Sequence, residues 1–277
     1  MRVRWLGWAG LEVEAAGETL IIDALEDPGA LYAPLGDLAR RVDLPTVVAP
    51  SSKRSAAAGL VTHLHRDHAD AGALGEALAP GSPVLGPPPA GGEKRENAGL
   101  AQATAELSEA GLPVEAMEPW AARDIGPFRI IALPAVDGLG DPQVSWLIEA
   151  EGQRVLHLGD TLFHGFWWRI AQRHGPFDAV FAPINGAVVS FPHRHPASPL
   201  PAVMDPEQAA IAADALTTRT VVPIHYGGYE LEPYYRPVPD EAERFMKAAT
   251  GRSYTARPLA VGEALDIVDA IIAAAAP

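Results

Sequence analysis

The sequence contains no cysteine. This absence excludes a disulfide-stabilised scaffold and a thiolate metal site, so any metal must bind to histidine, aspartate or glutamate. Long apolar runs are also missing. The opening MRVRWLGWAGLEVEAAGETLIID lacks the apolar region of a signal peptide, and the last apolar run, AIIAAAAP, is too short to cross a bilayer. We therefore expect a cytoplasmic protein without a membrane span.

Basic residues are scarce relative to acidic ones. Lys and Arg total 21 against 35 Asp and Glu, the formal net charge is −14, and no run is rich in lysine or arginine. A polyanion such as DNA would be repelled, so we expect a small-molecule partner and no nucleic acid. The 277 residues, 48% of them hydrophobic, suffice for one large α/β domain. The choice between a monomer and a homo-oligomer stays open.

Segments of apolar and alternating residues, separated by glycine and proline, predict two successive rounds of strands and helices. The first 23 residues predict hairpins, and the five prolines within 191–206 predict an irregular loop that ends where Asp205 caps a helix. Further strands are predicted at 59–65, 128–133, 144–150, 153–160, 178–183 and 220–227. Further helices are predicted at 70–79, 94–111, 163–174, 240–250 and 263–276, with a surface loop at 80–92. We see no domain boundary, so we expect a single α/β domain over 1–277 with a four-layer αββα sandwich.

Four candidate metal ligands fall within Thr62–His68, directly after a predicted strand. In an extended segment, His63 and His65 point to the same side because side chains alternate with a period of two. A turn just beyond would bring Asp67 and His68 toward a second, nearby position. Imidazoles and a carboxylate suit zinc, and also manganese or iron. The alternative is a solvated histidine-rich loop, but this spacing favours a metal site.

The segment His63–His68 matches the His-x-His-x-Asp-His motif of the metallo-β-lactamase superfamily. Leu158–Thr161 and Pro223–Gly227 resemble, in the same order, the superfamily segments with an aspartate that bridges two metals and with the final histidine ligand. The opening WLGWAG…LIID is similar to the branch that contains ascorbate-6-phosphate lactonase and N-acyl-phosphatidylethanolamine phospholipase D. The similarity runs from about residue 2 to residue 228. It implies the metallo-β-lactamase fold with two divalent metal ions.

The resemblance also implies roles for individual residues. Asp160 would bridge the two metals, and its alternative role is the N-cap of the following helix. His225 would be the final ligand, and its alternative role is that of a core histidine. Asp23 would be a hydrogen-bond partner of a ligand histidine, although a plain turn aspartate is nearly as good an interpretation. Asp67 would bind metal and orient the attacking hydroxide.

The sequence departs from the superfamily pattern at two positions. The family usually has a histidine, the third ligand of the first metal, where this chain has Asp137. We expect Asp137 to bind in its place; Asp141 is a competing candidate, and neither residue binding is the remaining alternative. A carboxylate makes the site harder and more anionic than three histidines would. The branch also usually has histidine at the position of Trp8.

Several further side chains are candidates for the substrate pocket or for supporting the ligands. His157 is equally consistent with a supporting role and with the core, and His164 and Tyr226 are candidate pocket residues. The other candidates are the histidines His193 and His195, the aromatic residues Trp167, Trp168, Tyr229, Tyr234 and Tyr235, and the arginines Arg194 and Arg236. Core packing explains the tryptophans just as well, and an exposed surface is the simpler interpretation of these loop histidines and arginines.

The expected ligand set suggests a reaction. Two metals about 3.5–4 Å apart share a water and lower its pKa toward about 7, so that hydroxide attacks a carbonyl carbon or a phosphorus. We expect hydrolysis of a small ester, lactone or amide. The alternatives are a phosphodiesterase of phospholipid-like or nucleotide substrates, and a metal-binding protein with little turnover. A glutamate in place of His65 would have indicated the oxygen-reducing di-iron relatives.

Overall fold

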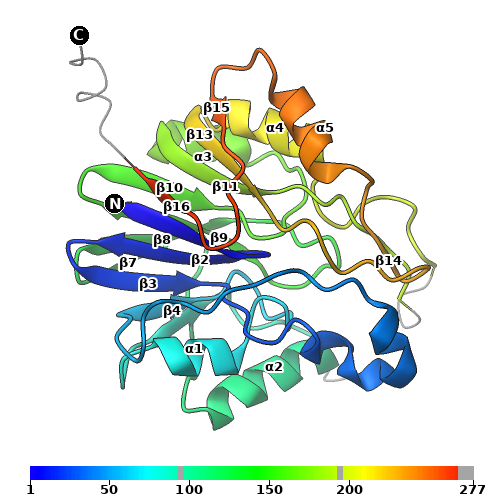
Figure 1. The fold of residues 1–277 in the computed structure, drawn as a ribbon. Helices are drawn as coiled ribbons and strands as arrows, with labels where there is room; N and C mark the ends of the chain where they lie inside the picture. Colours follow the sequence, from blue (N-terminus) through cyan, green and yellow to red (C-terminus); the bar gives the residue numbers. More distant parts are fainter. Residues whose placement is uncertain (93–96, 192–195, 268–277) are drawn as a thin grey trace.

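The alternating N-terminal segment forms the hairpins that its pattern predicts. In the computed structural model, which describes residues 1–92, 97–191 and 196–267, β1 (Arg2–Gly7) pairs antiparallel with β2 (Gly10–Ala15), and β2 pairs with β3 (Glu18–Ile22). Alternate side chains of these strands are buried at the centre of the molecule. The strands form the middle of the first of two large sheets (Figure 1).

The first sheet has the strand order β16-β1-β2-β3-β4-β5-β6. Its remaining strands are β4 (Ala58–Leu60), β5 (Val84–Gly86), β6 (Val114–Ala116) and β16 (Ala264–Asp266). From β3 to β6 the strands are parallel, and the helices α1 (Ala71–Ala77) and α2 (Ala98–Glu109) lie in the connections between them. Both helices cover the outer face of this sheet (Figure 1).

The second sheet has the order β15-β13-β11-β10-β9-β8-β7. Its strands are β7 (Ala122–Ile125), β8 (Phe128–Pro134), β9 (Val144–Ala150), β10 (Gln153–His157), β11 (Phe177–Pro183), β13 (Thr218–Ile224) and β15 (Thr255–Ala256). Its outer face is covered by α3 (Trp167–His174), α4 (Pro206–Ala215) and α5 (Glu241–Ala249). The four-layer αββα architecture predicted from the sequence is therefore confirmed (Figure 1).

Smaller elements complete the fold. A 3₁₀ segment, η1 (Ala30–Arg41), follows β3, and a two-stranded ribbon joins β12 (Val188–Val189) to β14 (Tyr235–Arg236). Within the described ranges, every helix is too short or too polar to cross a membrane.

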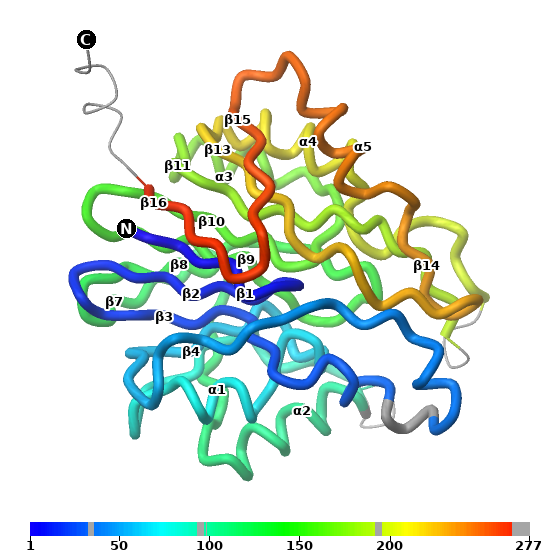
Figure 2. The backbone as a smooth tube through the Cα atoms, in the orientation of Figure 1, coloured from blue at the N-terminus to red at the C-terminus, as the bar shows by residue number. Residues whose placement is uncertain are grey.

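Two predictions from the sequence were wrong. The helix expected at 263–276 begins instead as strand β16, which runs beside β1 (Figure 2), and the residues after 267 lie outside the described part. Leu265 and Ile267 pack against the central core with a period of two, so pairing with β1 overrides the helical preference of the alanines. The loop expected at 80–92 contains β5, because two buried residues, Val84 and Leu85, are enough for a short strand between parallel neighbours.

The strand ends that matter for function lie at one edge. The strands β10, β11 and β13 are parallel neighbours, so their carboxyl ends are adjacent. Residues beyond the ends of parallel strands commonly form the site in α/β proteins. The loop after β4 reaches the same edge, because Thr62 O accepts a hydrogen bond from Val144 N, across the two sheets.

Asp205 is the N-cap of helix α4, as the sequence predicts, and the structure adds a capping box with Gln208. The Asp205 carboxylate accepts a hydrogen bond from Gln208 N at 2.8 Å, and Gln208 Oε1 accepts one from Asp205 N at 3.2 Å.

We expect Asp205→Ala to lower the free energy of unfolding by about 1 kcal/mol, measured by denaturant unfolding at equal metal content. Asp205→Asn retains an acceptor and should cost less. An alanine variant as stable as the parent would show that the cap contributes nothing.

Candidate metal centre

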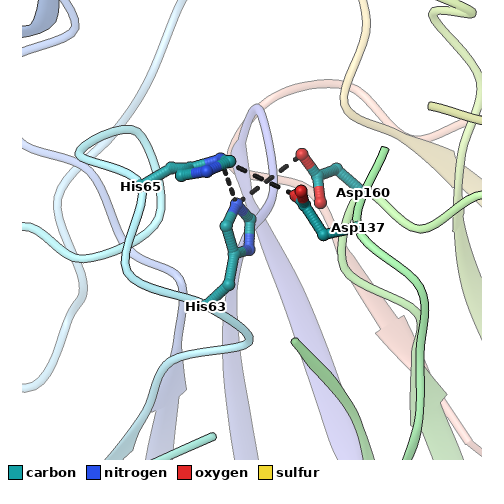
Figure 3. A group of neighbouring side chains, drawn as sticks. All are labelled: His63, His65, Asp137 and Asp160. Atoms are coloured by element: carbon teal, nitrogen blue, oxygen red, sulfur yellow. Dashed lines mark hydrogen bonds and ion pairs between the residues drawn. The ribbon is translucent and has the colours of Figure 1, made fainter. Parts of the chain in front are cut away.

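Two groups of imidazole and carboxylate side chains gather at this edge. Within each group, the candidate ligand atoms lie within 4.8 Å of one another. The first group, shown in Figure 3, contains His63, His65, Asp137 and Asp160. The second group contains Asp67, His68 and His225. Every residue predicted from the sequence to bind metal therefore belongs to one of these two groups.

The first group converges from three separate segments of the chain (Figure 3). His63 Nε2 lies 2.8 Å from His65 Nδ1 and 3.6 Å from Asp160 Oδ2. Asp137 Oδ2 lies 3.9 Å from His65 Nδ1. Ligand atoms around a tetrahedral zinc ion are about 3.4 Å apart, given bonds of about 2.1 Å. The separations of 3.6 and 3.9 Å are close to this value, and the two histidine nitrogens, at 2.8 Å, lie closer together.

The second group also lies close to the Asp160 carboxylate. His68 Nε2 lies 3.6 Å from Asp67 Oδ2 and 3.2 Å from His225 Nε2. His225 Nε2 also lies 4.0 Å from Asp160 Oδ2. Since the same oxygen of Asp160 is 3.6 Å from His63, Asp160 stands between the two groups.

The hydrogen bonds on the outer sides of the rings leave the inner nitrogens available to a cation. His68 Nδ1 lies 2.8 Å from Asp23 Oδ2, and His65 Nε2 lies 2.9 Å from Asp141 Oδ2. A ring nitrogen hydrogen-bonded to a carboxylate carries a proton, so the other nitrogen is the one that can give its lone pair to a metal when the metal displaces any proton on it. Those other nitrogens point into the two groups. Imidazole nitrogens together with carboxylate oxygens fit zinc, manganese or iron.

Burial and charge act in opposite directions on these histidines. Burial, together with neighbouring imidazoles, lowers the pKa values of His63 and His225 well below the ordinary value. Burial also acts to lower the pKa of His68, but Asp67 and Asp23 raise it to about 10. The edge is therefore a place where carboxylates draw positive charge into a buried site. A divalent cation can replace the protons that the carboxylates attract.

Asp137 and Asp141 contact opposite sides of the His65 ring. Asp137 Oδ2 faces Nδ1, the nitrogen that points into the first group, whereas Asp141 Oδ2 faces Nε2. Burial acts to lower the pKa of His65, but the hydrogen bond with Asp141 and the charge of Asp137 raise it to about 8. The other oxygen of Asp137 accepts hydrogen bonds from Leu139 N and Asp141 N at 2.7 and 3.0 Å. Asp137 is therefore held with one oxygen directed at the group.

Asp23 supports the second group from beneath. It is fully buried, and its Oδ1 and Oδ2 accept hydrogen bonds from Thr62 N at 2.8 Å and Thr62 Oγ1 at 2.6 Å. With His68 Nδ1 on Oδ2, the carboxylate links the end of β3 to the loop that carries the motif. A carboxylate in this position fixes the tautomer and orientation of a ligand histidine.

Asp160 is positioned by its neighbours on both sides. Gln143 Nε2 donates to Asp160 Oδ1 at 2.8 Å, which leaves Oδ2 facing the two groups. Gly159 has a φ of +71°, and a Cβ there would lie 2.5 Å from Gln143 Nε2. Glycine is needed because the backbone passes this side chain so closely. The helix α3 begins only at Trp167, so Asp160 is not its N-cap.

Trp8 contributes to the second group in a way that the sequence did not reveal. Its indole Nε1 donates a hydrogen bond to Asp67 Oδ2 at 3.1 Å, and its ring packs on His225 with centroids 3.9 Å apart. Its backbone oxygen accepts from His225 N at 2.9 Å. The resemblance marked this position as a lost histidine. The only signal in the sequence was the tryptophan in place of the usual histidine, because Asp67 and His225, the partners of Trp8, are distant in sequence.

Three residues predicted to support the ligands or line the pocket belong to neither group. His157 is buried and bonds to Ala9 O at 2.8 Å through Nε2, while its Nδ1 accepts from Gly159 N. His164 stacks on Trp167, and burial lowers its pKa to about 4. Tyr226 stacks on Trp5 in the rim of the central core. His157 thus supports the turn before Asp160, and the other two pack against aromatic neighbours.

The remaining candidates divide between core, surface and site. Trp167 is fully buried and Trp168 is exposed, as is Arg236. Tyr229 packs edge-on against Trp8 and donates its hydroxyl to Pro28 O. Tyr234 is partly buried in the loop before β14. His193, Arg194 and His195 lie outside the described residues.

One curated relative is similar over almost the whole chain. A protein named UPF0173 metal-dependent hydrolase, from Pyrobaculum calidifontis, is 27% identical over 278 residues, which covers 93% of this chain and 97% of the relative. Several other organisms have proteins of the same name that match this chain.

Solved structures show the same fold. A novel metallo hydrolase from the archaeon Ignicoccus hospitalis aligns with a TM-score of 0.63 at 18% identity, over 95% of this chain and 97% of its own. CmlA, a diiron beta-hydroxylase from Streptomyces venezuelae, aligns with a TM-score of 0.69 at 19% identity, over 95% of this chain and 53% of its own. The family model described as the beta-lactamase superfamily domain matches residues 18–226. The chain therefore belongs to the beta-lactamase superfamily, as its His63–His68 motif indicated.

Proposed function

We propose that this protein hydrolyses a small ester, lactone or amide at a centre that holds two divalent metal ions. The observation that carries the proposal is the position of Asp160. Its Oδ2 atom lies 3.6 Å from His63 Nε2 and 4.0 Å from His225 Nε2, so that one carboxylate joins two otherwise separate ligand groups. The enzyme class, a metal-dependent hydrolase, is that of the relatives that match nearly the whole chain.

The residues of the two groups would bind the metal ions, and one of them, Asp67, would also position the attacking water. His63, His65, Asp137 and Asp160 would hold one ion, and Asp67, His68 and His225 would hold the other together with Asp160. When bound, two such ions lower the pKa of a shared water toward about 7 and stabilise negative charge on the attacked group. Asp67 is fixed by the indole of Trp8. It would accept a hydrogen bond from the attacking water, orient that water, and accept its proton. A serine or cysteine nucleophile is not needed.

The ligand chemistry bears on which metal is bound. Asp137 supplies a carboxylate where a histidine is usual, so the first site is harder than a site of three imidazoles. We therefore propose that manganese or iron competes with zinc for this site more effectively than it would in a three-histidine centre. The cytoplasmic location stays a prediction from the sequence.

The function is tested by metal content and turnover measured together. Protein purified without chelator should contain metal by elemental analysis, and the His63→Ala/His65→Ala variant should lose it from the first group. The parent should hydrolyse p-nitrophenyl acetate or γ-butyrolactone faster than bis-p-nitrophenyl phosphate, and a chelator should abolish the activity. Asp160→Asn should lower kcat by orders of magnitude, because it weakens both groups.

Each alternative gives a different result in the same experiment. Turnover of the phosphodiester alone would identify a phosphodiesterase. Bound metal without turnover of any probe would identify a metal-binding protein. Equal metal in the parent and in the double histidine variant would overturn the assignment of the first group.

The third ligand of the first group can be tested separately. We expect Asp137→Ala to weaken metal binding to that group, while Asp137→His should retain the metal and shift the preference toward zinc. Asp141→Asn is the matched control, since it changes the carboxylate on the outer nitrogen of His65. Outer partners of ligand histidines typically contribute about 10- to 100-fold in metal affinity. Asp141→Asn should therefore lose less metal affinity than Asp137→Ala. Competition titration with a metal indicator measures each affinity, and an Asp137→Ala variant with both metals and full activity would place the ligand elsewhere.

The indole of Trp8 gives a prediction for the second group. Trp8→Phe removes the donor to Asp67 but keeps an aromatic ring against His225, so we expect about 10-fold weaker binding of the second metal and little change at the first. Trp8→His, which introduces the usual residue of the branch, should restore part of the loss. Titration to two-site stoichiometry measures both steps. Identical second-site affinity in Trp8→Phe and the parent would show that the indole hydrogen bond has no part in metal binding.

A further inference from the structure

Three neighbouring parallel strands end at the metal centre. Two of them are followed by candidate metal ligands, and the middle strand, β11, is not. Asp160 follows β10 and His225 follows β13, and β11 lies hydrogen-bonded between them (Figure 1). The register pairs Pro183, the last residue of β11, with Ile224, directly before His225. The next residues of this segment therefore enter the space between the two known contributors. Asn185 is the polar residue at this place, and it is fully buried.

Asn185 holds a phenol from a distant part of the chain. Its Nδ2 donates a hydrogen bond to Tyr235 Oη at 2.8 Å. The direction of the amide follows from its other contact, because Asn185 Oδ1 accepts from Ala187 N at 3.4 Å. The backbone of Tyr235 is held in turn by β14, which pairs with Val189 of β12. The phenol is thus held through its backbone and its oxygen.

The tyrosine hydroxyl retains a proton that it can donate. A phenol has one O–H donor and oxygen lone pairs, and Asn185 uses a lone pair. Burial raises the pKa of Tyr235 well above its ordinary value, and the carboxylates of Asp67 and Asp160 add to the effect. Tyr235 packs against the apolar cluster that contains Trp8, and Trp8 in turn contacts Asp67 and His225 of the second group. Tyr229, which is also near Asp67, already donates its proton to Pro28 O.

We propose that Tyr235 is a catalytic residue, whose phenol donates a hydrogen bond to the substrate oxygen that becomes negatively charged when water attacks, and that Asn185 positions it. This inference rests on the proposed hydrolytic function. Water adds to the carbonyl carbon, the electron pair of the C=O bond moves to oxygen, and the phenol stabilises that charge without giving up its proton. When the carbonyl re-forms, the C–O or C–N bond to the leaving group breaks, and the proton that Asp67 would accept from the attacking water passes to the departing oxygen or nitrogen. A fixed donor aimed at developing charge is an effective device in a partly dehydrated site.

The test compares phenol and amide variants in the metal-loaded, full-length protein with p-nitrophenyl acetate as the probe. Tyr235→Phe should lower kcat about 10- to 100-fold with KM changed less than about threefold, as expected for a hydrogen bond to a charged group. Asn185→Asp should have a similar effect. Its carboxylate would accept a hydrogen bond from the phenol, so the phenol could no longer donate that hydrogen bond to the substrate. The control is Tyr254→Phe, since Tyr254 donates to Ala210 O in the outer helical layer, and its kcat should stay within about twofold of the parent.

A binding measurement separates this inference from the function on which it rests. Phenylphosphonate imitates the tetrahedral anion, whereas benzoate is planar, and calorimetry gives the affinity of both in each variant. We expect Tyr235→Phe to weaken phenylphosphonate about 10-fold or more and benzoate much less. If the parent turns over no probe, the hydrolytic proposal fails, and the phosphonate affinities still test the donor.

The outcomes for Tyr235 are distinct. Equal kcat values and equal phenylphosphonate affinities in Tyr235→Phe and Tyr254→Phe would overturn the proposal. So would a loss in Tyr235→Phe that is fully explained by lower metal content or a lower melting temperature, both of which are measured on the same samples. If Asn185→Asp does not fold, Asn185→Ala, which removes the positioning hydrogen bond, should show a smaller loss in the same direction.

Discussion

Repulsion among buried carboxylates is the constraint on which this structure depends. Asp137 and Asp160 are buried and Asp67 is partly buried at one edge of the sandwich, where these carboxylates have lost hydration. Donors on their outer sides offset part of the cost: Gln143 holds one oxygen of Asp160, and two backbone N–H groups hold one oxygen of Asp137. The remaining oxygens face inward. Cations there would complete the arrangement, so metal binding and the stability of this edge are coupled.

The sandwich brings these groups together through the ends of its strands. Parallel strands in the second sheet deliver Asp160 and His225 at one edge, and the loop after β4 of the first sheet brings the His63–His68 motif against them. Hydrogen bonds across the sheets help to fix this arrangement, among them the bond from Val144 N to Thr62 O. The apolar core between the sheets holds the two sheets together and thereby holds the ligand-bearing strand ends and loops near one another.

The sequence predicted the parts of the site whose pattern is local. The motif His63–His68 concentrates its ligands in six residues, and the family resemblance of the segments at the ends of two apolar strands pointed to Asp160 and His225. The edge strand β16 was missed, since its pairing with β1 is a tertiary preference that an alanine-rich segment does not reveal. Contacts between distant polar residues leave no local pattern either, and these were not predicted: Trp8 with Asp67, Gln143 with Asp160, and Asn185 with Tyr235.

The separation of the ligands along the chain has a consequence for synthesis. His68 and His225 are 157 positions apart, whereas His63 and His65 are two apart. A growing chain therefore exposes a pair of imidazoles long before the last ligand exists, and closing so long a loop must wait for most of the sandwich. Two imidazoles bind an ion far more weakly than a complete set, so the reactive centre is assembled only in the finished molecule. A fragment that stops before β13 carries the recognisable motif without the chemistry.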